Sequence, residues 1–242
     1  DRDIWMRDMG DHYEYVAVYV DDLMIASKKP KAIIDALMGA HKLKLKGTGP
    51  TTFHLGCDYF RDDDGTLCVG PRRYIEKMCD EYTRMFGEPP RLKYSSPLEK
   101  NDHPELDDTE LLDAAGIQRY QSLIGTLQWT ITLGRIDVAT AVMSMSSFRV
   151  APRIGHLERL RRICGYLSKM RHAFIRIRTE EPDYSDLPQK KYDWARTAYG
   201  AVKEDIPHNI PKALGKRVVL SHYKDANLYN DMTTGRAVDG VL

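Results

Sequence analysis

Two adjacent aspartates interrupt a nearly continuous apolar segment, which reads Tyr13-Glu14-Tyr15-Val16-Ala17-Val18-Tyr19-Val20-Asp21-Asp22-Leu23-Met24-Ile25-Ala26. The β-branched and aromatic residues on both sides predict strands, and the continuous apolar run predicts that both of their faces are covered. Because adjacent strand residues point to opposite faces, Asp21 and Asp22 are presented together only where the chain turns. Aspartate tolerates turns, so we expect a β-hairpin in which residues 13–20 pair antiparallel with residues 23–27.

Asp21 and Asp22 are also candidate metal ligands. Two neighbouring carboxylates repel each other unless a cation lies between or beside them. Mg²⁺ is commonly held by one or two carboxylates together with the phosphates of a substrate. The alternative is an ordinary aspartate-rich turn between two buried strands.

Length and charge limit the class of protein. The chain has 242 residues, of which 42% are hydrophobic, so it can form one large domain or two smaller ones around a core. Its net charge of +1 excludes a global basic field, and any surface for nucleic acid must be local. The sequence has no apolar run long enough to span a membrane and no secretory signal. It begins at Asp1 without a methionine, and we expect a fragment of a longer protein.

Neither the cysteines nor the acidic turn at residues 62–65 predicts a metal centre. The cysteines form no C-x-x-C pair and have no histidine at a zinc-like spacing, so we expect reduced, intracellular, mostly buried thiols: Cys57, Cys68, Cys79 and Cys164. A calcium loop that began at Asp62 would need glutamate at its twelfth position, where Arg73 stands. A hairpin turn is the better interpretation.

Hydrophobic periodicity predicts the remaining elements. We expect strands at residues 3–7, 53–60 and 66–69, a helix that begins near Pro30, a second helix at residues 71–85, and three further helices at residues 116–133, 136–148 and 152–170. The last three helices are closely spaced, which predicts a small antiparallel bundle.

Basic residues are concentrated between residues 149 and 178, where Glu158 is the single acidic residue. Arginine dominates this stretch, and its planar guanidinium suits bidentate contact with phosphate. Apolar residues of the last helix should face the bundle and leave the basic side outward. The candidate contacts to a nucleic-acid backbone are Arg153, Arg159, Arg161, Arg162 and Lys169. The alternative is a solvated helix face.

The C-terminal part changes character again. Prolines scattered among charged residues at positions 180–215 predict a tether. We expect it to dock through its aromatic residues, Tyr184, Tyr192, Trp194 and Tyr199. Residues 217–223 predict a further strand, with residues 235–242 as a hairpin partner.

Seven blocks of the sequence, in order, resemble those of the copia-type retrotransposon polyprotein. They are Tyr19–Asp22, Phe53–Gly56, Ser96–Leu98, Tyr120–Leu127, Gly134–Ala139, His156 with Arg161–Leu167, and His222–Asn227 with Thr233–Arg236. The sequence differs from the family pattern at two positions of the last block, with Asn227 in place of the usual aspartate and Leu228 in place of tryptophan.

The resemblance implies an α+β fold with four parts. Residues 1–70 would be the C-terminal part of a reverse transcriptase palm, made of antiparallel hairpins and a helix. Residues 71–178 would be a helical thumb-like bundle or connection, residues 179–215 a tether, and residues 216–242 the truncated start of an RNase H domain with a terminal β-hairpin. A cytoplasmic particle or the nucleus would be its location.

The same resemblance implies roles for individual residues. Asp21 and Asp22 would hold two Mg²⁺ or Mn²⁺ ions for nucleotidyl transfer, and Asp225 would be the first metal carboxylate of RNase H. Phe53, Leu55 and Gly56 would steady the primer end. The partners would be an RNA or DNA template–primer, deoxynucleotides and the upstream part of the same polyprotein. Because the family places a third carboxylate on an earlier palm strand, we expect this chain alone to be inactive.

Two other functions remain open at this point. The chain could be a decayed or co-opted module that keeps its arginine-rich helix to hold nucleic acid without catalysis. A weaker alternative is a metal-dependent phosphatase that uses Asp21 and Asp22. The sequence disfavours it because no histidine or further carboxylate cluster is near.

Overall fold

The computed structural model describes residues 2–180, 183–186, 188, 193–198, 200, 205, 207–216, 224–227, 231–235 and 238–241. Within these residues the fold is α+β, with five α-helices and strands that all pair antiparallel, as predicted. The chain divides into two compact units. Unit 1 contains Asp1–Pro50 and Thr179–Leu220, and unit 2 contains Thr51–Arg178 and Ser221–Leu242.

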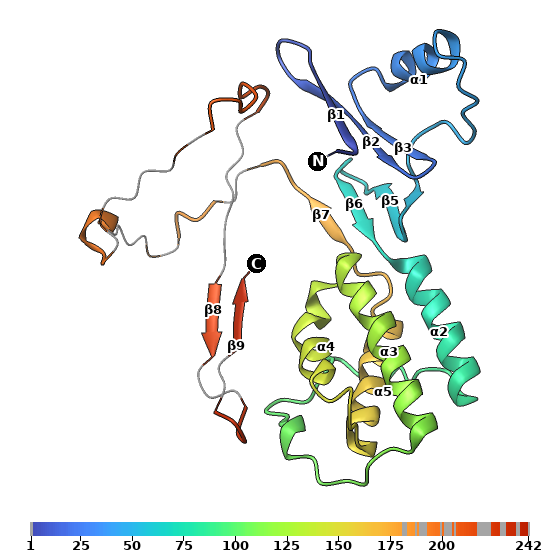
Figure 1. The fold of residues 1–242 in the computed structure, drawn as a ribbon, viewed down its shortest axis with the longest axis vertical. Helices are drawn as coiled ribbons and strands as arrows, with labels where there is room; N and C mark the ends of the chain where they lie inside the picture. Colours follow the sequence, from blue (N-terminus) through green and yellow to red (C-terminus); the bar gives the residue numbers. More distant parts are fainter. Residues whose placement is uncertain are drawn as a thin grey trace. The chain divides into compact units, whose positions relative to one another are not determined.

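A three-stranded sheet forms the centre of unit 1, with β1 (Ile4–Asp8), β2 (Tyr13–Tyr19) and β3 (Asp22–Ala26) in that order. Helix α1 (Pro30–Gly39) follows, with proline in its first turn (Figure 1). The prediction that both faces of these strands are covered is wrong for the described residues, since Glu14 is the only buried side chain of the sheet. Helix α1 also buries no residue. The apolar run of β2 and β3 therefore did not show whether another element would cover these strands.

A four-stranded sheet belongs to unit 2, in the order β4 (Phe53–His54), β5 (Cys57–Arg61), β6 (Leu67–Gly70) and β7 (Ile175–Ile177). The single strand predicted at residues 53–60 is wrong, because the chain reverses at Leu55 and Gly56. Strand β7 was not predicted. It is only three residues long, and it owes its place to pairing with β6, more than 100 residues earlier in the chain.

Unit 2 contains four α-helices among its described residues, and local sequence signals mark one end of two of them. They are α2 (Arg72–Phe86), α3 (Ala114–Thr132), α4 (Ala139–Ser146) and α5 (Ile154–Lys169). Helix α2 ends at Gly87, whose φ of 74° is the left-handed conformation of a helix cap. Helix α3 begins at Asp113, whose side chain accepts a hydrogen bond of 2.7 Å from the Gly116 amide. The helix predicted at residues 136–148 instead starts with a 3₁₀ turn, Ile136–Val138.

The four helices enclose one hydrophobic core (Figure 1). Its buried residues are Ile75, Met78, Tyr82, Tyr120, Leu123, Ile124, Leu127, Val138, Ala141, Val142, Met145, Leu160, Ile163, Cys164 and Leu167. A fully buried large apolar side chain contributes about 1.5–3 kcal/mol. The polar end of Tyr120 is satisfied, because its hydroxyl donates to the Met145 carbonyl at 2.7 Å. The apolar side of α5 faces this core through Leu160, Ile163 and Leu167, as predicted.

The C-terminal residues contain a two-stranded sheet of β8 (Lys224–Asn227) and β9 (Val238–Val241). A terminal β-hairpin was predicted, but the strand expected at residues 217–223 lies outside the described residues, as do Tyr192 and Tyr199 of the tether. Between these two tyrosines in the chain, Trp194–Arg196 forms a 3₁₀ turn.

Two further expectations concern the whole chain. All four cysteines are free and three are buried, which confirms the prediction of mostly buried thiols. Among the described residues, no helix has both the length and the apolar character needed to cross a bilayer.

Candidate functional site

The β2–β3 hairpin presents both candidate metal ligands at one end. Tyr19 pairs with Asp22, so Val20 and Asp21 form a two-residue turn and Asp22 opens β3. Both aspartates are exposed. The prediction of an antiparallel hairpin is confirmed, but its tip is Val20 and Asp21 and not Asp21 and Asp22, because Asp22 already pairs with Tyr19. The role of the two aspartates as ligands stays a prediction.

Val20 holds this turn in a strained conformation. Its φ is +56°, a region that β-branched residues almost never occupy, and a residue held there costs of order 1–3 kcal/mol. A positive φ at the first turn position is a role that glycine normally fills. Val20 is 85% exposed, so packing inside the chain does not explain its presence. Backbone strain of this kind is concentrated at functional sites, which marks the turn as a candidate site.

Polar contacts fix the far end of the same hairpin. The buried carboxylate of Glu14 on β2 accepts hydrogen bonds from Arg7 on β1 and from the Ser27 hydroxyl just after β3. These bonds, first that from Ser27 and then that from Arg7, hold the pKa of Glu14 below its ordinary value. All three strands are therefore tied together away from the turn, which stiffens the support of Asp21 and Asp22.

The carboxylates of the turn are of the kind that binds magnesium. Two exposed carboxylates on consecutive residues are a donor set that suits Mg²⁺, which keeps several waters and takes further oxygens from substrate phosphates. Within the part of the chain that the structure describes, no three histidine, cysteine, aspartate or glutamate side chains are grouped as a metal site. Asp21 and Asp22 thus fit a shared substrate–metal site and do not by themselves complete a two-ion site.

A second strained hairpin tip carries the residues predicted to steady a primer end. Leu55 and Gly56 connect β4 to β5 with φ values of +49° and +88°, the pattern of a tight two-residue turn. Leu55 is 43% exposed. A side chain at position 56 would press against Leu133, because an added Cβ would lie 3.1 Å from its Cδ1. Phe53 lies under a guanidinium, with Arg73 Cζ 4.2 Å from the ring centroid.

The basic residues predicted to contact phosphate lie on or beside α5, but they bind other parts of unit 2. Arg159 donates to Asp102 at 2.8 Å and to Asp107 at 2.6 Å, and its side chain is only 22% exposed. Hydrogen bonding to Asp102 raises the pKa of Arg159. Burial acts to raise the pKa of Asp107, but hydrogen bonds from Thr109 and Arg159 outweigh it and lower that pKa.

The other members of the basic set have partners as well. Arg161 donates to the Tyr82 hydroxyl at 2.8 Å and pairs with Glu158 and Glu88. Arg162 donates to Glu99 at 2.6 Å and to Ser96. Arg153 donates to the Thr109 carbonyl, and Lys169 donates to Ser95 at 3.0 Å.

The expectation of an outward basic face is therefore wrong in its geometry, because these arginines fold back onto the segment before α3 and onto α2. Phosphate contact by Arg153, Arg159, Arg161, Arg162 and Lys169 stays a prediction. It would require them to exchange internal partners for phosphate.

Asp225, the predicted RNase H carboxylate, lies in β8 opposite Gly240 of β9. Its role also stays a prediction. Sequence reasoning did not identify Val20 as a strained residue, since strain is a property of the backbone. It also passed over a lysine-rich stretch after β3, which was visible in the sequence as Lys42-Leu43-Lys44-Leu45-Lys46.

Comparisons with known proteins place the homologues of this chain among transposon proteins and retrovirus-related Pol polyproteins. The chain is 30% identical over 221 residues to the putative transposon Ty5-1 protein of Saccharomyces cerevisiae. It is 26% identical over 170 residues to the retrovirus-related Pol polyprotein from transposon RE1 of Arabidopsis thaliana, and 26% identical over 155 residues to that from transposon TNT 1-94 of Nicotiana tabacum.

These matches cover 90%, 69% and 62% of this chain, respectively. The chain spans 65% of the length of the yeast protein and 11% of each plant polyprotein. No protein-family model matches the chain, and no solved structure does. The homology supports relationship to a retrotransposon polyprotein, as the sequence blocks implied.

Proposed function

We propose that this chain is part of a copia-type reverse transcriptase and that the Val20–Asp21 turn, with Asp22, belongs to its nucleotidyl-transfer site. The observation that carries the proposal is a strained hairpin turn, 85% exposed at Val20, that presents two exposed carboxylates. The similarity to transposon Pol polyproteins supports the same assignment.

The reaction joins the primer 3′ oxygen to the α-phosphorus of a deoxynucleotide and breaks the α–β phosphoanhydride bond, which releases pyrophosphate. Asp21 and Asp22 would hold magnesium at this point. The chemistry that the metal supplies when bound is activation of the 3′ hydroxyl and compensation of the charge that develops on the phosphates.

The remaining residues act by position. The Glu14 contacts tie the three strands, so the two carboxylates are held on a stiff support while the reacting groups change. Tyr19 and Val20 are 55% and 85% exposed beside the carboxylates and are free to contact the primer end. Phe53, Leu55 and Gly56 are proposed to support the primer from the second turn, as the family resemblance implies.

The direct test is primer extension by the polyprotein that contains this chain. Asp21→Asn should abolish DNA synthesis and leave template–primer binding largely intact, because it removes a metal ligand and keeps the size of the side chain. Asp80→Asn is the matched control, since Asp80 is an exposed carboxylate on α2 with no role in the proposed site, and this variant should be silent.

An Asp21→Asn polyprotein that extends primers at the normal rate would overturn the proposal. A wild-type polyprotein that binds the template–primer but does not extend it would favour the non-catalytic binding module instead. The 242 residues alone should not extend a primer, because two ions about 3.5–4 Å apart need more carboxylate oxygen than Asp21 and Asp22 supply.

The proposed RNase H role of Asp225 can be tested separately from DNA synthesis. In the same polyprotein, Asp225→Asn should reduce degradation of the RNA strand of a hybrid and leave DNA synthesis unchanged. Unchanged RNA degradation would remove the RNase H role from this residue.

A further inference from the structure

A second basic region lies in unit 1, and no sequence block or residue assignment above accounts for it. It spans residues 28–46 and is called the lysine segment here. It contains six lysines and a single acidic residue, Asp35, in a chain whose total net charge is +1. The six are Lys28, Lys29, Lys31, Lys42, Lys44 and Lys46. The segment is therefore a strong local departure from an almost neutral background.

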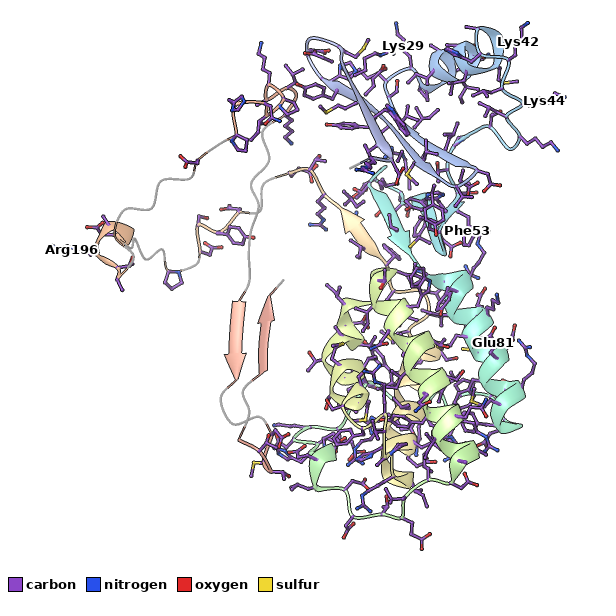
Figure 2. All side chains as sticks on the ribbon, viewed as in Figure 1. Lys29, Lys42, Lys44, Phe53, Glu81 and Arg196 are labelled. Atoms are coloured by element: carbon purple, nitrogen blue, oxygen red, sulfur yellow. The ribbon has the colours of Figure 1, made fainter. Side chains whose placement is uncertain are left out.

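The lysines of this segment are exposed, and most of their side chains have no partner among the described residues. Lys28 donates to Asp11 at 2.8 Å. For the other five, no ion pair or side-chain hydrogen bond is formed with any residue that the structure describes. Figure 2 shows Lys29, Lys42 and Lys44 projecting outward around α1 and the loop after it.

The backbone brings the two groups of lysines to the same small element. Helix α1 ends at Gly39, and Lys42 then takes a φ of +54°, which reverses the chain. The Leu43 amide donates back to the Leu37 carbonyl at 3.1 Å. Lysines from before the helix and lysines from after it are thus presented by one helix and its return loop.

Apart from Lys28, which pairs with Asp11, these lysines are not placed to stabilise unit 1. The lysines at and before the start of α1 lie where the helix dipole favours anions, and no acidic residue occupies that first turn. Five uncompensated ammonium groups on one short segment also repel each other. An anionic partner would relieve this repulsion, and lysine binds phosphate well as a compact point charge.

The spacing suits a repeating polyanion. Alternate residues of an extended chain are about 7 Å apart at most, and lysine has a flexible stem that adjusts its reach. Phosphates recur about every 3.4 Å along the axis of one strand of a duplex. Lys42, Lys44 and Lys46 could therefore meet successive or alternate phosphates.

We propose that the lysine segment binds the phosphate backbone of the nucleic acid on which the aspartate turn of the same unit acts. The identity of this partner rests on the proposed function, while the need for a polyanion rests on the charges alone. The segment contrasts with α5, whose arginines are already paired with carboxylates. Backbone contact of this kind positions a strand and does not read its sequence.

The test is binding of the 242-residue chain to a short RNA–DNA hybrid, measured by fluorescence anisotropy across a salt series with EDTA present. The logarithm of affinity should fall linearly with the logarithm of salt, by about 0.7–0.9 for each phosphate contacted. Replacing Lys42, Lys44 and Lys46 together by glutamine should lower that slope by about 2–3. The loss should be equal for hybrids of unrelated sequence.

A matched control carries the same change of charge elsewhere. Lys77, Lys93 and Lys100 are exposed lysines of unit 2, and their triple glutamine variant should keep the wild-type slope. An unchanged slope in the lysine-segment variant overturns the proposal, as does an equal loss in the control or a chain that does not bind the hybrid. Stronger dependence on these lysines for vesicles of phosphatidylserine and phosphatidylcholine than for the hybrid would assign the surface to a membrane and overturn it as well.

This outcome is separable from that of the proposed function. EDTA removes any contribution of metal at Asp21 and Asp22, so the slope does not depend on catalysis. A flattened slope together with an active Asp21→Asn polyprotein would retain the surface and reject the catalytic assignment. An unchanged slope with an inactive Asp21→Asn polyprotein would do the reverse.

Discussion

The α5 region and the lysine segment are similarly basic in sequence but differ in how their charges are paired in the folded chain. Both are short, strongly basic and nearly free of acidic residues in sequence. In the structure, the α5 arginines pair with Glu88, Glu99, Asp102 and Asp107, all distant in sequence, whereas five lysines of the other region meet no carboxylate among the described residues. Charge along the chain is thus a poor guide to charge at the surface, because pairing is decided by which segments fold together.

The pairing on α5 also has a clear structural purpose. Asp102 and Asp107 belong to the segment before α3, and their contacts with Arg159 fasten that segment along α5. Thr109 adds a hydrogen bond from the Gly155 amide at 2.9 Å, and the Ile154 amide donates to the Glu110 carbonyl. The α5 arginines therefore stabilise unit 2, and the lysines are available to a partner.

The largest expected effect is on α5. Arg159→Met keeps the apolar stem and leaves Asp102 and Asp107 without their partner in a largely buried position. Removal of one member of such a pair typically costs about 3–5 kcal/mol. Urea unfolding of the chain should show this loss, and a change below 1 kcal/mol would mean that the network is only a surface contact.

A glycine substitution should have opposite signs in the two regions. Gly155→Ala on α5 places a Cβ against the carboxylate of Asp107, which Thr109 and Arg159 hold in place, and should destabilise the chain by about 1–3 kcal/mol. Gly39→Ala on α1 meets no atom within 4 Å and should stabilise the helix by up to about 1 kcal/mol. Thermal unfolding of both variants checks the signs, and equal signs would contradict the difference in packing.

Acid should weaken the α5 region through His156. Its Nδ1 accepts from the Arg153 amide at 3.1 Å, and its Nε2 lies 2.8 Å from the Pro104 carbonyl, so the ring is bound as the neutral form. Burial lowers the pKa of His156, and the positive charge of Arg159 lowers it further. The hydrogen bond to Pro104 and the nearby charge of Asp107 act to raise this pKa, but they do not outweigh burial.

Because the unfolded chain takes up a proton near pH 6.5 and the folded chain only at lower pH, the stabilising contribution is complete above about pH 6.5. It is lost as the pH falls from there to the folded pKa. His156→Gln can keep both hydrogen bonds without titrating, so its stability should change less between pH 7 and pH 5 in urea unfolding. An identical pH dependence in the two proteins would remove His156 as the cause.

The smallest expected effect is in the lysine segment. The Lys42, Lys44 and Lys46 triple glutamine variant should change the free energy of unfolding by less than about 0.5 kcal/mol for each site, because the side chains are exposed and unpaired among the described residues. Urea unfolding measures it. A large loss would show that these lysines have a structural role and would weaken their assignment to a partner.

Local pattern was sufficient for most elements of this protein. The β-formers around Asp21 and Asp22 predicted the hairpin, and apolar spacing predicted the helices α2, α3 and α5 and the buried side of α5. These features depend on residues within a few positions of each other, since turn chemistry and amphipathic periodicity are local. The blocks shared with retrotransposon polyproteins were readable for the same reason.

Folding in three dimensions decided the rest. The reversal at Leu55 and Gly56 and the strain at Val20 are backbone conformations that many sequences avoid, so residue type did not predict them. Strand β7 exists through its pairing with β6, and the ion pairs of Arg159 join residues 57 and 52 positions apart. The lysines were visible in the sequence from the start, but their lack of internal partners became apparent only when the carboxylates had been located, because an ion pair depends on distance in space.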